Sequence, residues 1–246
     1  MRPASSNTTL STARSEAALT VGGARVPLVV VRSARARRLR LAVVPGGGLR
    51  LTLPRRAALA PALAWAEGQG TWIEAALARV VPAVALAPGS SLPFDGQTLT
   101  VRWDEAAGRR VRVVGDALVV GGPAELVSTR LLRWLKAEAR ARLEAETRAT
   151  AVRAGVSIGR VRVGDARTRW GSCSSGGDVA YNWRLVLAPV EVRLATVAHE
   201  VAHRLHMDHS PAFHAAVARI LGHEPKAERA WLRTNGAALH AIGRDG

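Results

Sequence analysis

The chain has 246 residues, of which 48% are hydrophobic and 22% are charged, the balance of an ordinary globular protein. Its single cysteine excludes an intramolecular disulfide and an all-cysteine zinc site. The sequence has no run of about 18 apolar residues, so we expect no membrane span. Its Ser/Thr-rich start lacks the apolar centre of a secretory signal. These features predict a cytoplasmic protein.

The net charge is +16, which is compatible with a polyanionic partner. Of the 35 basic residues, only Lys136 and Lys226 are lysine and the other 33 are arginine. The arginines are spread along the chain, and the densest group, residues 35–40, alternates with apolar residues as on the solvated face of a strand. We therefore favour a dispersed arginine-rich surface and keep a nucleic-acid partner as the weaker alternative.

The N-terminal half is predicted to be rich in β-strands. Residues 1–22 are expected to form a disordered lead, and residues 23–122 a β-rich module. An apolar run predicts a short buried strand over 26–31, and alternating apolar and polar residues predict strands over 38–44 and 49–53. Turns at Asp95-Gly96 and Gly115-Asp116 predict two hairpins. Between them, the apolar period of residues 54–80 predicts two short helices, because Gly68 and Gly70 interrupt it.

The C-terminal half, residues 123–246, is predicted to form the catalytic domain. A linking helix is expected from Pro123 to about Ala154, with Gly155 ending it. Three short strands are predicted next, followed by a helix from Pro189 to about Met207 and two more helices. The strands are expected over 158–163, 168–172 and 179–187, and the last two helices from 211 and over 225–239. The predicted fold class is α+β.

The strongest chemical signal is His199-Glu200-Val201-Ala202-His203. Two histidines four residues apart project from one face of a helix, which is the spacing at which they can hold one zinc ion. A chain with this content of His and Glu contains such a motif by chance about once in a hundred. We therefore predict one zinc ion per chain, bound by His199 and His203.

A catalytic zinc site takes three protein ligands and keeps one position open. Two residues are candidates for the third ligand. His206 would lie one turn further along the same helix, so its ring would have to reach back past His203. His209 precedes Ser210-Pro211, where the helix must have stopped, and a turn there can bring its ring back to the metal. We expect His209 to be the ligand and His206 to be a packing residue or a partner of a ligand.

Glu200 is predicted to be the general base. It lies between the two ligand histidines, where it can take a proton from a zinc-activated water and pass it to the leaving amine of a peptide. The expected function is therefore a zinc-dependent peptidase, with a peptide or protein as its substrate.

Four segments together resemble the YgjP-like metallopeptidase family, which is related to the SprT-like and WLM zinc metallopeptidases. The segments are Thr168-Arg169-Trp170-Gly171-Ser172-Cys173-Ser174, Tyr181-Asn182-Trp183-Arg184-Leu185, His199-Glu200-Val201-Ala202-His203 and His209-Ser210-Pro211-Ala212-Phe213. The likeness covers roughly residues 26–221. It implies a zincin-like catalytic domain, zinc ligands at His199, His203 and His209, and the general base at Glu200. The chain has Arg204, Asp208 and His214 where the family usually has an apolar residue, Asn and Trp.

Two other functions compete with the peptidase. Arg167, Arg169 and Arg184 are near the motif, and guanidinium groups match phosphate, which favours a metal-dependent nucleotide hydrolase. That alternative lacks a Gly-rich phosphate loop and a carboxylate cluster for magnesium. The charge and the SprT-like kinship favour a DNA-associated protease.

Overall fold

The computed structural model describes residues 14–44 and 47–244. The chain divides after Pro82 into two compact units. The second unit contains all seven histidines. The predicted boundary after residue 122 falls inside this second unit, because a second β-sheet and the long helix that follows it share one hydrophobic core.

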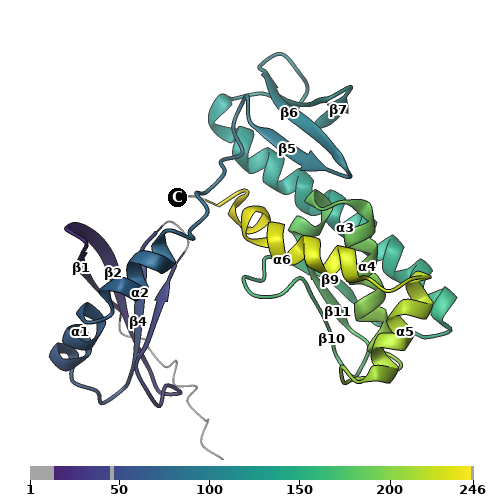
Figure 1. The fold of residues 1–246 in the computed structure, drawn as a ribbon. Coiled ribbons are helices and arrows are strands. Elements are labelled where there is room, and N and C mark those ends of the chain that lie inside the picture. Colours follow the sequence, from purple (N-terminus) through teal and green to yellow (C-terminus); the bar gives the residue numbers. More distant parts are fainter. Residues whose placement is uncertain (1–13, 45–46, 245–246) are drawn as a thin grey trace, which may run out of the picture. The chain divides into compact units, whose positions relative to one another are not determined.

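The first unit is a four-stranded sheet that packs against two helices (Figure 1). Its strands are β1 (Arg14–Val21), β2 (Ala24–Ser33), β3 (Arg40–Val43) and β4 (Leu49–Pro54), in the order β1-β2-β4-β3. Its helices are α1 (Leu59–Glu67) and α2 (Gly70–Leu77), as the two glycines predict. Leu49, Leu51 and Leu53 are fully buried because alternate residues of β4 face the helices.

The predicted disordered lead is wrong where the structure describes it. Residues 14–21 form β1, which pairs with β2 along its whole length. Its apolar residues, Leu19 and Val21, are buried against the helices. The remainder of the predicted lead, residues 1–13, lies outside the described residues.

The second unit begins with another four-stranded sheet. Its strands are β5 (Ser91–Phe94), β6 (Gln97–Asp104), β7 (Arg112–Val114) and β8 (Ala117–Gly121), in the order β5-β6-β8-β7. Both predicted hairpins are confirmed. Asp95 and Gly96 both have positive φ, 52° and 82°, as a tight two-residue hairpin turn requires. In each of the two four-stranded sheets, two antiparallel hairpins join through a central parallel pair.

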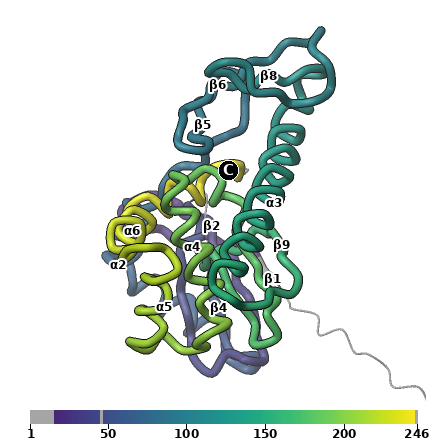
Figure 2. The backbone as a smooth tube through the Cα atoms, turned by 90° about the vertical axis from the view of Figure 1, so that its right-hand side faces the viewer, coloured from purple at the N-terminus to yellow at the C-terminus, as the bar shows by residue number. Residues whose placement is uncertain are grey.

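The long helix α3 (Val127–Ala154) follows a short 3-10 helix, η1 (Ala124–Leu126). Leu131, Leu135, Ala139 and Leu143 recur every four residues and are fully buried, so they form one face of the helix. Gly155 ends the helix in the left-handed conformation, as predicted. Figure 2 shows the helix running from the β5–β8 sheet to strand β9.

A three-stranded sheet precedes the histidine motif. It contains β9 (Val161–Gly164), β10 (Gly171–Cys173) and β11 (Val179–Asn182), in the order β10-β11-β9. The strand predicted over 179–187 is only half right, because residues 183–187 form the buried 3-10 helix η2 (Trp183–Leu187). The Asn182 side chain accepts a hydrogen bond from the Arg184 amide, which caps η2 and ends the strand.

Three helices complete the second unit (Figure 1): α4 (Val190–Ala202), α5 (Pro211–Leu221) and α6 (Lys226–Ala241). The fold class is therefore α+β, as predicted. Helix α4 ends about five residues before the predicted end. Arg193 of α4 forms ion pairs with Asp95 and with Glu146 of α3, each at 2.9 Å. Among the described residues, no helix combines the length and apolar character needed to cross a membrane.

Candidate metal centre

Three imidazoles meet where α4 ends and α5 begins. His199 comes from the last turn of α4, His203 is its C-terminal cap, and His209 lies in the connecting loop. One ring nitrogen from each lies within 4.8 Å of the other two. The ring centroids are 4.9–5.1 Å apart, so the three rings form a nearly equilateral triangle. The structure thus brings together the three predicted ligands.

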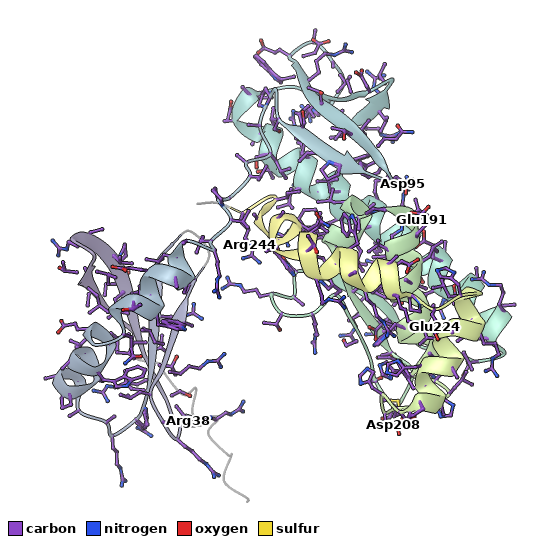
Figure 3. The ribbon with its side chains drawn as sticks, viewed as in Figure 1. Arg38, Asp95, Glu191, Asp208, Glu224 and Arg244 are labelled. Atoms are coloured by element: carbon purple, nitrogen blue, oxygen red, sulfur yellow. The ribbon has the colours of Figure 1, made fainter. Side chains whose placement is uncertain are left out.

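The loop between α4 and α5 is shaped by local hydrogen bonds. The Ser210 hydroxyl accepts from the Phe213 amide, which caps α5, and Pro211 occupies its first turn. The Asp208 carboxylate accepts from the Ser210 amide and is a turn residue, at the place that Figure 3 labels. These contacts reverse the chain directly after His209, so its ring is directed back toward α4.

Phe213 packs against all three histidines. Its ring centroid is 4.6–4.9 Å from those of His199, His203 and His209, and the side chain is fully buried. An aromatic ring in contact with three imidazoles restricts how each of them can rotate. In the sequence, Phe213 stands out only as the last residue of the segment His209–Phe213, and its position three residues after Ser210 is the signal that could have placed it here.

His206 contributes through its backbone. Its carbonyl oxygen is 3.2 Å from Nδ1 of His203. When Nδ1–H donates to that carbonyl, the lone pair of His203 is on Nε2, the nitrogen then free for a metal. The imidazole of His206 is not part of the cluster.

The donor set fits a zinc ion. Two nitrogens at about 2.0–2.1 Å from a tetrahedral zinc lie about 3.3 Å from each other. The Nε2 atoms of His199 and His209 are 3.2 Å apart. Three imidazole ligands are also the set used by catalytic zinc sites that keep a position open.

Glu200 lies beside the cluster and is almost fully buried, with 4% of its surface exposed. Its carboxylate packs against the backbone of Gly171 in β10. A Cβ atom at position 171 would be 2.7 Å from Cγ of Glu200 and would overlap its Oε1. The other oxygen, Oε2, is buried and has no hydrogen-bond partner among the described residues. Only glycine leaves room for this carboxylate, and sequence analysis assigned Gly171 no such role.

The comparison with protein families gives a match over residues 37–235, to the YgjP-like metallopeptidase domain. The chain belongs to the YgjP-like metallopeptidase family. Neither the curated proteins nor the solved structures give a match. The resemblance predicted from the sequence motifs is therefore confirmed.

Burial sets the protonation of the YgjP-like site. Burial, with the neighbouring rings of His203 and His209, lowers the pKa of His199 to about 4. Burial also lowers the pKa of His203, so both rings are neutral near pH 7 and able to bind a metal. Burial raises the pKa of Glu200 to about 7, while the charge of Arg169 acts in the opposite direction. A carboxylate with this pKa is suited to proton transfer near neutral pH.

Two residues considered in the sequence analysis have structural roles in the YgjP-like fold. The guanidinium of Arg184 is fully buried and donates to Asp165 and to the carbonyl oxygen of Ile242, so Arg184 is not available to bind a phosphate. Trp183 is fully buried as well. Trp170, in contrast, is half-buried, stacks on His240 and lines a cavity next to Glu200.

Proposed function

We propose that the protein is a zinc-dependent peptidase in which His199, His203 and His209 hold the metal and Glu200 is the general base. The observation that carries this proposal is the position of Glu200. Glu200 comes directly after His199 in the sequence, and His199 is one of the three imidazoles of the cluster. The buried carboxylate of Glu200 has one oxygen without a hydrogen-bond partner among the described residues. Membership of a metallopeptidase family supports the same reaction class. The proposed catalytic domain is zincin-like.

Zinc, when bound, supplies Lewis-acid chemistry that acidifies a water molecule and polarises a substrate carbonyl. The protein supplies the proton transfers. Glu200 accepts the proton of the attacking water and donates it to the leaving amine nitrogen. The raised pKa of Glu200 makes both transfers accessible near pH 7. Gly171 and the surrounding burial hold the carboxylate in place and restrict bulk water.

A metal analysis combined with a peptide-library digest tests the proposal. We expect about one zinc per chain, hydrolysis of peptides by the zinc-loaded protein, and loss of both in His199→Ala and His203→Ala. Glu200→Gln should keep the metal and reduce hydrolysis by a factor on the order of 10² or more. Glu191→Gln is the matched control, because Glu191 is an exposed carboxylate in the first turn of the same helix (Figure 3).

If Glu200→Gln turned over peptides like the wild type, the general base would be another group. Hydrolysis of nucleoside triphosphates instead of peptides by the zinc-loaded protein would favour the nucleotide alternative.

One observation in the first unit favours a second candidate function, binding to DNA. The sequence from residue 17 to residue 66 contains no Asp or Glu. Because β2 and β4 are parallel and pair Ser33 with Pro54, the loops that follow them lie at the same end of the sheet. This end, which we call the arginine end, contains Arg32, Arg35, Arg37, Arg38, Arg40, Arg55 and Arg56.

The arginine end is not neutralised by any residue that the structure describes. Arg38 lies at this end of the sheet (Figure 3). Six of its seven arginines are exposed. Arg32 donates to the carbonyl oxygens of Arg55 and Ala57, and none of the described residues forms an ion pair with this group. Clustered guanidinium groups of this kind bind the phosphates of a duplex.

Fluorescence anisotropy with duplex DNA at several salt concentrations tests this function. The double variant Arg37→Gln, Arg38→Gln should reduce the magnitude of the slope of log K against log salt by about 0.9 for each phosphate that the protein no longer neutralises. The control is Arg133→Gln, Arg140→Gln, which removes two exposed arginines from α3. Equal effects of the two double variants would mean that only the total charge matters.

A further inference from the structure

A cavity of about 390 Å³ opens next to the candidate metal centre. His199 and Glu200 line one part of it. Any substrate whose scissile bond lies beside Glu200 must therefore place a neighbouring group in or across this cavity. The cavity is within the size range of small-ligand sites, which start at about 300 Å³.

The wall of the cavity is mainly apolar. Helix α4 contributes Val192 and Ala195, both buried, and helix α6 contributes Leu232. Trp170 and Pro225 complete this apolar part. Trp170 is held in place, because its ring stacks on His240 at a centroid distance of 4.4 Å and also lies against Gly236, where a Cβ atom would be 3.2 Å from its Cζ2. A rigid apolar wall of this kind selects a large apolar side chain.

Two arginines also line the cavity. Arg229 and Arg233 are four residues apart on α6 and so lie on the same face of that helix. Neither has a carboxylate partner among the described residues. Arg229 is half-buried, its Nη2 is 3.3 Å from Nδ1 of His214, and it lines the same cavity as His199. The guanidinium of Arg229 is thus close to the metal centre.

The one acidic side chain on the cavity wall besides Glu200 is already engaged. Oε1 of Glu228 is 2.8 Å from Nε2 of His223, and this hydrogen bond lowers the pKa of Glu228. Its other oxygen, Oε2, is buried without a hydrogen-bond partner among the described residues, and neither oxygen forms an ion pair with Arg229 or Arg233. The cavity combines an apolar wall with two cations that form no ion pair with any described residue, which is a poor site for a cationic or wholly apolar ligand.

We propose that this cavity binds the substrate residue next to the scissile bond and selects a large apolar side chain on that residue. Arg229 and Arg233 bind a carboxylate adjacent to that side chain. The guanidinium fork matches a carboxylate with two parallel hydrogen bonds. The carboxylate belongs either to the free C terminus of a peptide or to a neighbouring acidic side chain. This inference rests on the proposed peptidase function and specifies its substrate.

Equilibrium binding to Glu200→Gln protein, measured by calorimetry, tests the proposal without turnover. Three short peptides carry the same Phe residue: one ends at Phe with a free carboxylate, one ends at Phe with an amide, and one is amidated with an Asp after Phe. We expect at least one carboxylate peptide to bind about tenfold or more tightly than the amide. Tighter binding of the first peptide would identify the C terminus as the source of the carboxylate, and tighter binding of the third would identify an acidic side chain. Replacing Phe by Gly should weaken binding by about tenfold.

Variants on the Glu200→Gln background assign the effect to the two arginines. Arg229→Gln, Arg233→Gln should abolish the preference for a carboxylate while leaving the preference for Phe over Gly. Arg229→Lys keeps the charge but loses the planar fork, so the preference should be reduced rather than lost. Arg140→Gln, an exposed position on α3 outside the cavity, is the control and should bind like its parent.

Equal binding of the three Phe peptides would overturn the carboxylate site. The same would follow if Arg140→Gln lost the preference for a carboxylate as fully as the Arg229→Gln, Arg233→Gln variant. Failure of this proposal can be told apart from failure of the peptidase function. Carboxylate-selective binding with no hydrolysis of any peptide by the zinc-loaded wild type would overturn the peptidase but keep the ligand class. Hydrolysis of peptides without any carboxylate preference in binding would keep the peptidase function but overturn the ligand class.

Discussion

The backbone of Gly171 and the carboxylate of Glu200 pack so closely that a side chain at position 171 would force Glu200 to move. A Cβ atom there would be 2.7 Å from Cγ of Glu200. Gly171 lies in β10 and Glu200 in α4, which are in contact, so the edge of the three-stranded sheet fixes the position of the proposed general base. The position of strand β10 is thereby linked to the proton transfer that we propose for Glu200.

We expect Gly171→Ala to reduce peptide hydrolysis by about 10²-fold, because a displacement of a catalytic group by about 1 Å has an effect of this size. Zinc content should not change, since the three atoms nearest to a Cβ atom at position 171 all belong to Glu200 and not to a proposed ligand. Gly176→Ala is the matched control, because its Cβ would meet only Ser174 Oγ at 3.8 Å. Wild-type activity in Gly171→Ala would mean that Glu200 has no fixed position in the reaction.

The two histidines that competed as the third ligand differ in how they reach the centre. His209 directs a ring nitrogen at His199, whereas His206 offers its carbonyl oxygen to His203. His209→Ala should therefore lower the zinc affinity by about 10²-fold or more, while His206→Ala, which retains that carbonyl, should cost at most about tenfold. Competition with a chelator measures both constants. The reverse order would assign the third ligand to His206.

The contact of Phe213 with all three imidazoles predicts a selective defect. Phe213→Leu should lower the zinc affinity by about tenfold, because the rings lose the surface that orients them. It should lower the free energy of unfolding by only about 1 kcal/mol, since the replacement is apolar and of similar size.

Val217→Ala is the comparison for Phe213→Leu, because Val217 is fully buried on the same helix, in the same apolar cluster as Phe213, but has no ring that could pack on the imidazoles. We expect it to be less stable and to bind zinc normally. A parallel loss of zinc affinity in both variants would indicate a general loosening of α5.

Local sequence was sufficient to predict the histidine cluster. The spacing of His199 and His203 and the helix start at Ser210-Pro211 are short-range signals, and the structure brings these residues together. The end of α4 was predicted about five residues too late, since residues 203–207 contain nothing that forbids a helix. Its end at Ala202 depends on the turn in which the Ala202 carbonyl accepts from the amides of Leu205 and His206.

Features that depend on distant contacts could not be predicted in the same way. The need for glycine at position 171 arises only because Glu200, 29 residues later, packs against it. The cavity beside Glu200 is formed where α4, α6 and Trp170 come together, and no short stretch of sequence contains that information. The strand β1 was missed because its few apolar residues are buried only after pairing with β2 and packing on the helices.

The raised pKa of Glu200 predicts how the stability of the metal-free protein depends on pH. The carboxyl group has a pKa of about 7 in the folded protein against an ordinary value of 4.5. Between these values the folded state binds more protons than the unfolded state, so the free energy of unfolding falls as the pH rises. The contribution of Glu200 to the free energy of unfolding is complete below pH 4.5 and is lost as the pH rises through about 7. Its full size is about 3 kcal/mol.

His199 acts in the opposite direction, because its lowered pKa makes the folded state gain stability as the pH rises from about 4 to 6.5. A single pH curve therefore mixes the two groups. The difference between Glu200→Gln and wild type separates them, because the variant keeps His199 and loses only the titrating carboxyl. Urea unfolding in the presence of a chelator, at intervals from pH 5 to pH 8, should show Glu200→Gln gaining stability relative to wild type as the pH rises. The difference for the exposed Glu191→Gln should stay flat, and a flat difference for Glu200→Gln as well would mean that burial does not perturb the proposed base.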